Sequence, residues 1–293
     1  MLGLLDQDPH TLSEGDPLPL GWHWLYFKEP LRASHLGPDG HESRGAFMPD
    51  VDLPRRMWGG GTLRLLRPAL IGEPAELRSQ IRDVREKQGK SGRLVFVTVG
   101  HTVRQSGHAC VEEQQVIVYR EAERQPASAP GRAGSTVGYE SADRSGAAAP
   151  PTLGHADIPP AAWTETFLPT TVTLFQFSAL TYNGHRIHYD HPYVTQREGY
   201  PSLLVHGPLT ALVLLDAAQR LGPAPVCRFR YRALAPLYVD EPILLTERYE
   251  PSGADTRDRT AGDTSPRQHV VEALGPTGSV ALRGWITHEG DQP

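Results

Sequence analysis

The sequence predicts an α+β protein in which two curved antiparallel sheets, one from each half of the chain, wrap around a buried helix. Three observations indicate this fold class. Strand-like runs recur in both halves of the 293-residue chain. A stretch crowded with Ala, Pro, Gly and Ser divides the chain near its middle, at 123–160. One long apolar segment, 204–222, has the pattern of a helix that is buried on all sides.

The first half, residues 1–122, contains strand candidates separated by turn signals. A short strand is expected at 21–30, followed by an irregular region rich in Gly, Pro and Asp that extends to the glycines 59–61. Four further runs show mixed or alternating apolar spacing: 62–70, 76–87, 93–105 and 108–121. The turn sequences KSGR and QSGH separate several of them. No segment of this half has the pattern of the buried helix, so its helix is expected to be degenerate.

The segment 123–160 is expected to be a flexible linker. Its composition cannot bury enough apolar surface to offset the entropy of ordering the chain. The chain is therefore predicted to consist of an N-terminal half (1–122), this linker and a C-terminal half (161–293).

The second half repeats the strands and adds the helix. A β-rich run at 171–180 is followed by a polar loop and then by the helix, which Gly222 and Pro223 end. Four more strand candidates follow: 225–236, 242–251, 267–276 and 279–289. One strand, a buried helix and four strands make the hotdog arrangement. Its strands recur in the first half, so a double hotdog is predicted.

The bulk properties exclude several classes of protein. A net charge of −5 and a pI near 6.2 give no electrostatic reason to expect nucleic acid as a partner. No run approaches the roughly 18 apolar residues that span a bilayer, and the N-terminus lacks the pattern of a secretory signal. Cys110 and Cys227 lie far apart and predict no disulfide framework. We therefore expect a cytoplasmic protein that binds neither nucleic acid nor membrane.

The polar residues of the second half concentrate in one loop, YNGHRIHYD at 182–190. It is expected to connect a strand to a helix, a position where catalytic groups are often presented. His188 has a side chain suited to proton transfer near neutral pH, whereas Asn183 can hold a water molecule but cannot titrate. Asp190 precedes His191 and Pro192 and is expected to be a helix N-cap.

His206 and Gly207 open the buried helix. A helix N-terminus offers unpaired backbone N–H groups and a positive dipole end, which suit developing negative charge.

These features resemble the MaoC-like (R)-specific enoyl-CoA hydratases, whose loop reads roughly Asp-x-Asn-Pro-x-His and is followed by His-Gly at the helix start. Aligning the last histidine places that family's catalytic histidine at His188 and its aspartate at Asn183. Its asparagine falls at His185 and its proline at Arg186. The branch with mitochondrial type 2 3-hydroxyacyl-thioester dehydratase and the bacterial mesaconyl-C4-CoA and itaconyl-CoA hydratases is more similar. The resemblance covers the segments FSALTYNGHRIHYD, LLVHGPLTA, LPRRMWGGG (53–61) and GRLVFVTV (92–99).

The resemblance implies reversible hydration of an enoyl thioester. In that reaction His188 would move the proton, Asn183 would hold the water and the backbone N–H of Gly207 would bind the thioester oxygen. The residues expected to bind substrate are Arg186, His206, Tyr182, Trp58 and Arg230. Coenzyme A would be part of the substrate, and no separate cofactor is expected.

The favoured substrate is a short dicarboxylic acyl-CoA such as mesaconyl-C4-CoA or itaconyl-CoA. The alternatives are a 3-hydroxyacyl-thioester dehydratase of fatty-acid synthesis and a non-catalytic module that binds acyl thioesters. A homodimer of double hotdogs is also left open.

The side chains allow four further interpretations. The histidines and aspartate of the loop (His185, His188, Asp190 and His191) match no strong metal-binding pattern, so no metal is expected. A thioesterase would need a carboxylate on the helix, and none precedes Asp216. Alternate arginines share one strand face, either as a solvated surface or as a landing site for the coenzyme A phosphates: Arg228, Arg230 and Arg232. Arg55 and Arg56, with Trp58, could line the acyl pocket.

Overall fold

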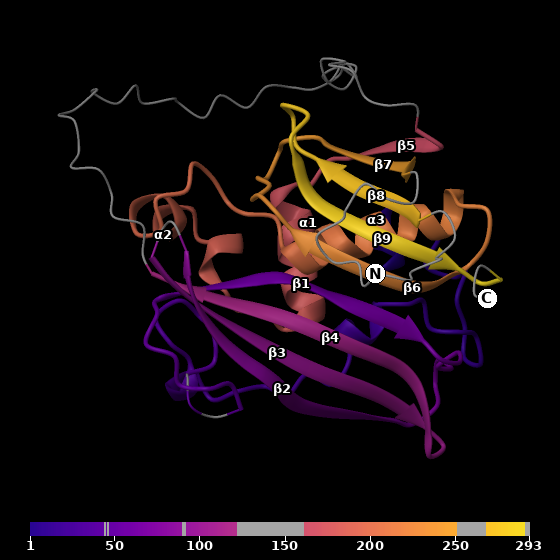
Figure 1. Ribbon diagram of the computed structural model, residues 1–293, viewed down its shortest axis with the longest axis horizontal. Coiled ribbons are helices and arrows are strands. Elements are labelled where there is room, and N and C mark those ends of the chain that lie inside the picture. Colours follow the sequence, from indigo (N-terminus) through magenta and orange to yellow (C-terminus); the bar gives the residue numbers. More distant parts are fainter. Residues whose placement is uncertain (44, 46, 90–91, 122–160, 251–267, 291–293) are drawn as a thin grey trace.

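The computed structural model describes residues 1–43, 45, 47–89, 92–121, 161–250 and 268–290, and their strands form one antiparallel sheet (Figure 1). The first half contributes β1 (Arg55–Leu65), β2 (Ala75–Gly89), β3 (Gly92–Gln105) and β4 (His108–Arg120). The second contributes β5 (Trp163–Phe167), β6 (Val226–Ala233), β7 (Ile243–Glu250), β8 (Gln268–Leu274) and β9 (Val280–His288). The order is β2-β3-β4-β1-β6-β9-β8-β7-β5. The predicted double hotdog is confirmed, with its two sheets joined edge to edge.

The join between the halves is the antiparallel pair β1–β6, which aligns Gly60 with Arg232 and Gly61 with Tyr231. Here the backbones lie so close that a Cβ on Gly60 would come within 2.4 Å of the Tyr231 carbonyl oxygen. The glycine run 59–61 was expected to follow an irregular region. It lies instead inside β1, where the close approach of two neighbouring strands requires glycine.

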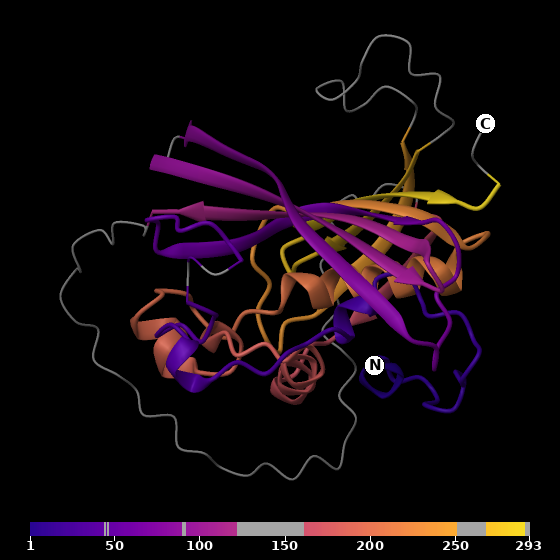
Figure 2. The ribbon, with the colours of Figure 1, turned by 90° about the horizontal axis from the view of Figure 1, so that it is seen from below.

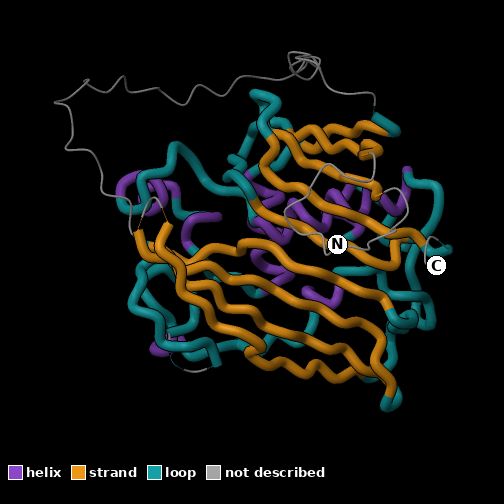
Figure 3. Tube along the Cα trace, viewed as in Figure 1, coloured by secondary structure: helices purple, strands orange, loops and turns teal. Residues whose placement is uncertain are grey.

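Three α-helices lie on one face of the sheet (Figure 2): α1 (Thr171–Thr181), α2 (His191–Gln196) and α3 (Gly207–Leu221). The predicted buried helix is confirmed as α3, and Gly222 caps its C-terminus. Buried side chains point from every side of it: Leu209, Thr210, Ala211, Leu212, Val213, Leu214, Leu215, Ala217 and Ala218. Short 3₁₀ turns form at Leu2–Leu5, Trp22–Leu25, Ala33–His35 and Arg186–His188 (Figure 3).

The run 171–180 was expected to be a strand and is helix α1, so that prediction was wrong. The β-branched and aromatic residues favour a strand by composition, but a capping box between Thr170 and Thr173 starts a helix at this point. The strand that precedes α3 in the chain is β5.

The strand expected at 21–30 is also wrong. Gly21 adopts a φ of 89° and the chain turns into a 3₁₀ helix whose Trp22, His23 and Trp24 are buried. A Cβ on Gly21 would lie 2.6 Å from the Leu212 side chain of α3. The described residues of the first half contain no α-helix, and this N-terminal segment packs against α3 in the shared core. The predicted linker, 123–160, lies outside the described residues.

Strand β2 forms one end of the sheet and has no buried residue. Charged side chains of both signs line it: Glu76, Arg78, Arg82, Asp83, Arg85, Glu86 and Lys87. Within the described part of the chain, no helix is both long enough and apolar enough to cross a membrane.

Candidate active site

The loop 182–190 connects helix α1 to helix α2, whereas the sequence predicted a strand before it. Tyr182 ends α1 in the left-handed conformation, with a φ of 50°. Asp190 caps α2 by accepting a hydrogen bond from the Tyr193 N–H at 3.0 Å, so the expected N-cap is confirmed. The loop is therefore anchored at both ends by helix termini.

His188 is buried and held in one orientation. Its Nδ1 lies 2.8 Å from the Leu204 carbonyl oxygen. Because a carbonyl only accepts, Nδ1 must donate, and in the neutral ring Nε2 carries the lone pair. Burial, reinforced by His185, lowers the pKa of His188 to about 3. The ring is therefore neutral at pH 7 and can accept a proton at Nε2.

His206 stacks on His188, with ring centroids 3.6 Å apart and an interplanar angle of 19°. Its Nε2 lies 2.9 Å from the Ser178 hydroxyl of α1, while its buried Nδ1 has no hydrogen-bond partner. Burial and the neighbouring His188 lower the pKa of His206 well below its usual value. The start of α3 thus brings a second neutral imidazole against the first.

Trp58 covers the start of α3 from the other half of the chain. A Cβ on Gly207 would lie 2.8 Å from Cε3 of Trp58, so only glycine allows this approach. Trp58 also stacks on Tyr231, with centroids 4.6 Å apart. The structure therefore brings Trp58, Gly207, His206 and His188 together, as expected for a site between the two halves.

Asn183 and Arg186 are engaged within the loop region. The Asn183 Oδ1 accepts a hydrogen bond from the His185 N–H at 3.0 Å and so fixes the position of His185. Arg186 donates to the Asp190 carboxylate at 2.7 Å and lies over the Tyr193 ring.

Two of the expected substrate-binding residues lie away from this cluster. Tyr182 is 60% exposed at the end of α1. Arg230 lies on the sheet face opposite Phe229 and Tyr231, with its guanidinium over Trp285 at 4.3 Å. The structure does not bring Arg230 to His188, because alternate residues of a strand face opposite sides.

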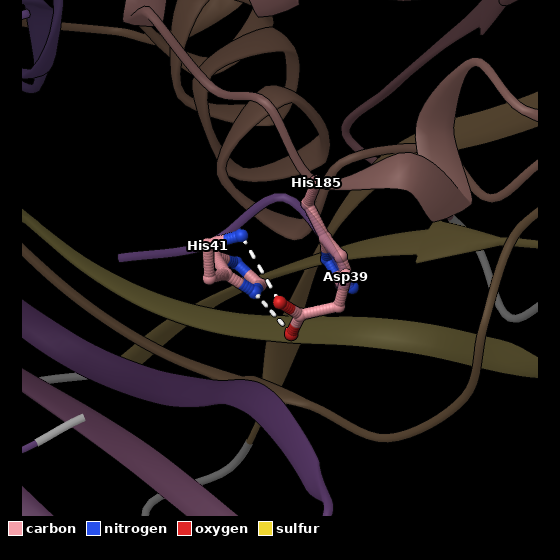
Figure 4. A group of neighbouring side chains, drawn as sticks. All are labelled: Asp39, His41 and His185. Carbon is pink, nitrogen blue, oxygen red and sulfur yellow. Dashed lines mark hydrogen bonds and ion pairs between the residues drawn. The ribbon is translucent and has the colours of Figure 1, made fainter. Parts of the chain in front are cut away.

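Asp39 and His41, which were not expected from the sequence, reach the site from the first half (Figure 4). The Asp39 Oδ2 lies 3.0 Å from Nδ1 of His41, and the His41 ring lies 4.0 Å from the ring of His185. His185 in turn meets His188 edge to face at 5.4 Å. Pro-Asp-Gly at 38–40 is a turn signal, but nothing in the sequence links this turn to the loop 182–190.

The pKa values of Asp39 and His185 are both influenced by His41. Burial alone would raise the pKa of Asp39, but the hydrogen bonds and charge of His41 outweigh it and hold that pKa well below the usual range. Burial, with His41 adding to it, lowers the pKa of His185 to about 3. An ionised carboxylate therefore lies close to the His185 imidazole, which is neutral at pH 7.

The backbone of the 37–42 turn is fixed against the loop. The Arg186 N–H donates to the Asp39 carbonyl at 2.9 Å. Gly40 has a φ of +87°, and a Cβ there would lie 1.9 Å from the Gly184 carbonyl oxygen.

Arg56 adds a positive charge to the same region. It precedes Trp58 by two positions on β1 and so shares its face, and it contributes to lowering the pKa of His185. Among the described residues, none forms a hydrogen bond or ion pair with the Arg56 guanidinium. Arg55, by contrast, donates to the Glu198 carbonyl at 2.7 Å. Arg56 is thus a cation beside the histidines with no anion of its own.

Within the described residues, two groups place histidine and carboxylate donor atoms within 4.8 Å of one another. They are Asp39 with His41 and His185, and Glu247 with His269 and His288. In each group the carboxylate already binds one imidazole, that of His41 in the first and that of His269 in the second. The metal cluster considered within the loop does not form, because Asp190 binds Arg186 and His191 is exposed.

The carboxylate of α3 does not support thioester hydrolysis. Asp216 accepts hydrogen bonds from Gln7 at 2.9 Å and from Arg220 at 2.8 Å. It lies in the last half of the helix that begins at Gly207. The carboxylate that a thioesterase would need is therefore committed elsewhere.

Comparison with known families decides the class of the protein. Residues 21–239 match the family model described as hydroxyacyl-thioester dehydratase type 2. The chain belongs to this family. The type 2 dehydratase family gives the protein its reaction class, a hydro-lyase of the hydratase/dehydratase type that acts on an acyl thioester.

Individual relatives agree with this assignment to the type 2 dehydratase family. The chain is 41% identical to mesaconyl-C(4)-CoA hydratase from Chloroflexus aurantiacus over 92% of its own length and 83% of that protein. It is 29% identical to the mitochondrial hydroxyacyl-thioester dehydratase type 2 of Schizosaccharomyces pombe, over 76% of this chain and 75% of that one.

Solved structures share the fold. The crystal structure of HtdX from Mycobacterium tuberculosis has a TM-score of 0.58 at 14% identity, covering 98% of this chain and 93% of that one. A MaoC-like dehydratase from Phytophthora capsici has a TM-score of 0.53 at 14% identity, covering 86% and 81%.

Proposed function

We propose that the protein catalyses the reversible hydration of a short dicarboxylic enoyl-CoA, with mesaconyl-C4-CoA or itaconyl-CoA as the favoured substrates. The unpaired Arg56 beside His185 carries this choice of substrate. The 41% identity to a mesaconyl-C(4)-CoA hydratase over 92% of the chain supports it.

The first chemical step follows from the orientation of His188. Its Nε2 takes a proton from water as the water oxygen bonds to the β-carbon, and the π electrons move toward the thioester oxygen. The first N–H groups of α3, beginning at Gly207, stabilise the negative charge on that oxygen. Trp58 covers this point and keeps water from competing for the N–H groups. Asn183 acts through the backbone of His185.

The position of Arg56 fits the second carboxylate of the substrate. In mesaconyl-C4-CoA this carboxylate is bonded to the β-carbon, which is the atom that receives the hydroxyl group. The side chain that binds this carboxylate must therefore lie near His188. Arg56 lies beside His185, which contacts His188, and guanidinium is the side chain that best matches a carboxylate.

A panel of thioesters tests the proposal: mesaconyl-C4-CoA, itaconyl-CoA, crotonyl-CoA, and trans-2-decenoyl thioesters of coenzyme A and of acyl-carrier protein. We expect kcat/KM for a dicarboxylic substrate to exceed that for the others by at least about 100-fold, because an unfilled charged site rejects apolar analogues. His188→Ala should lower kcat by about 10²–10⁴ on every substrate while the protein stays folded.

Two results would contradict the proposal. Preference for a decenoyl thioester would favour a dehydratase of fatty-acid synthesis. Binding without turnover of any thioester would indicate a non-catalytic module.

A further inference from the structure

The reaction requires a second proton transfer that His188 does not explain. Hydration places a proton on the α-carbon while another group takes one from water, so an acid and a base are both needed. Asn183 cannot serve as the acid, because an amide does not titrate and its Oδ1 already binds the His185 N–H. The acid must come from another titratable group beside His188.

Two imidazoles contact His188, and they differ in whether their ring nitrogens form hydrogen bonds within the protein. His206 lies flat against it, is only 1% exposed and has Nε2 tied to Ser178. His185 meets His188 edge to face, and neither of its ring nitrogens forms a hydrogen bond to any described residue. His185 is therefore the imidazole with both nitrogens open, one for a substrate and one for a proton donor.

A pair of side chains beside His185 can supply the proton. The Asp39–His41 pair lies against the other side of His185, with the His41 and His185 rings 4.0 Å apart (Figure 4). Its side chains are 30% and 24% exposed, so it reaches solvent, whereas His185 and His188 are 9% and 7% exposed. The centroids of His41, His185 and His188 follow one another at 4.0 and 5.4 Å.

We infer that His185 is the second catalytic residue, which delivers the proton to the α-carbon, and that Asp39 and His41 form a relay that reprotonates it. The inference rests on the proposed hydration. It assigns two positioning residues to the first half of the chain, whereas the base and the acid lie in the second.

The proton balance closes within the cluster. Water gives its hydroxyl to the β-carbon and its remaining proton to Nε2 of His188. The α-carbon takes a proton from one nitrogen of His185 as the His41 imidazolium gives a proton to the other. Asp39 stays ionised throughout and stabilises the His41 cation. The turnover leaves His188 protonated and His41 neutral, and the proton returns through His185 to His41.

Three variants of the full-length protein test the inference with crotonyl-CoA and any other thioester that the wild type hydrates. His185→Gln keeps hydrogen-bonding capacity but cannot transfer a proton, so we expect kcat to fall about 10²–10⁴-fold with KM changed less than roughly threefold. Asp39→Asn should lower kcat less. Glu42→Gln is the matched control, because Glu42 is an exposed carboxylate in the same turn. It should retain wild-type kinetics.

The pH profile separates a relay from a purely structural role. Besides Asp39 and His41, the charged or titratable groups that face His185 are Arg56, His188 and His206. Removing the Asp39 charge destabilises the protonated relay. The limb on which kcat falls with rising pH should therefore move to lower pH by about one unit in Asp39→Asn. It should not move in Glu42→Gln.

Several results would overturn the inference while leaving the proposed function intact. They are wild-type kcat in a folded His185→Gln protein, an unmoved pH profile in Asp39→Asn, and loss of wild-type activity in EDTA that a divalent metal restores. If the wild type hydrates no enoyl-CoA, the proposed function itself fails.

Discussion

Three histidines buried at one point must stay neutral in the folded protein, and this has a thermodynamic cost below neutral pH. His185, His188 and His206 all have lowered pKa values, chiefly because burial penalises the cation. Neutrality suits catalysis, because a base must have a free lone pair at the working pH. The same burial makes the folded state less able than the unfolded chain to bind protons.

The stability of the protein should therefore fall as the pH drops below about 6.5, the pKa of an unfolded histidine. Each fully buried histidine removes about 1.4 kcal/mol per pH unit until its folded pKa, about 3 for His185 and His188, is reached. The lowered pKa of Asp39 acts at a different pH, because its contribution is lost only below the unfolded value of about 4. Thermal unfolding from pH 7 to pH 5 checks this. His188→Gln should flatten the dependence, and a wild-type Tm that does not change over this range would contradict it.

At the scale of elements, the sequence predicted the helices and strands that a short stretch of sequence specifies by its apolar spacing and its end signals. Helix α3 followed from an apolar segment closed by Gly222 and Pro223, and strands β2–β4 and β6–β9 followed from apolar spacing between turns. Strand β1 overlaps the predicted run 62–70 only at 62–65, and β5 was not predicted. Composition misled at 171–180, where the Thr170 cap overrides β propensity. It misled again at 21–30, where packing against α3 decides the conformation.

The residues of the candidate site likewise include some that the sequence predicted and some that it did not. His188, Gly207 and Trp58 were singled out through short sequence segments, and the structure places them together. Asp39 and His41 could not be found from the sequence, because only the tertiary fold brings the 37–42 turn to a loop that lies far along the chain.

The 37–42 turn depends on Gly40. Comparing Gly40 with Gly45 separates the effect of a steric clash from the effect of a left-handed backbone. Gly40→Ala must move the turn, because the added Cβ would lie 1.9 Å from the Gly184 oxygen. Gly45→Ala has a similar φ of +88° but no contact closer than 3.9 Å. Both variants should lose about 1 kcal/mol of stability from the left-handed backbone. Only Gly40→Ala should also lose kcat, by about tenfold or more. Equal kinetics in the two variants would show that the turn has no part in the reaction.

At the scale of the molecule, the β1–β6 pair makes the halves one sheet, and α3 packs against the N-terminal segment of the first half. We propose that 1–122 and 161–293 are halves that complete one another across the linker 123–160. The second half alone would leave the edge of β6 unpaired and one side of α3 without cover.

Expression of residues 155–293 alone should therefore give an inactive protein that aggregates or pairs with itself. Co-expression of residues 1–125 should restore part of the activity. Size-exclusion chromatography with an activity assay measures both outcomes. A monomeric and fully active 155–293 fragment would show that the first half is dispensable.

The open end of the sheet at β2 has a consequence for the protein at high concentration. Strand β2 pairs with β3 on one side only, and the open edge of a strand of this length is a template on which another chain could add by backbone hydrogen bonding and so begin a fibril. Here Arg78, Arg85 and their neighbours surround the edge with hydrated charge, and Arg82 lies close against Gly100 of the adjacent strand. Burying these charges against a second copy would cost more than the new backbone bonds contribute. We therefore expect the charged edge of β2 to oppose the addition of another strand, so that the concentrated protein does not form fibrils.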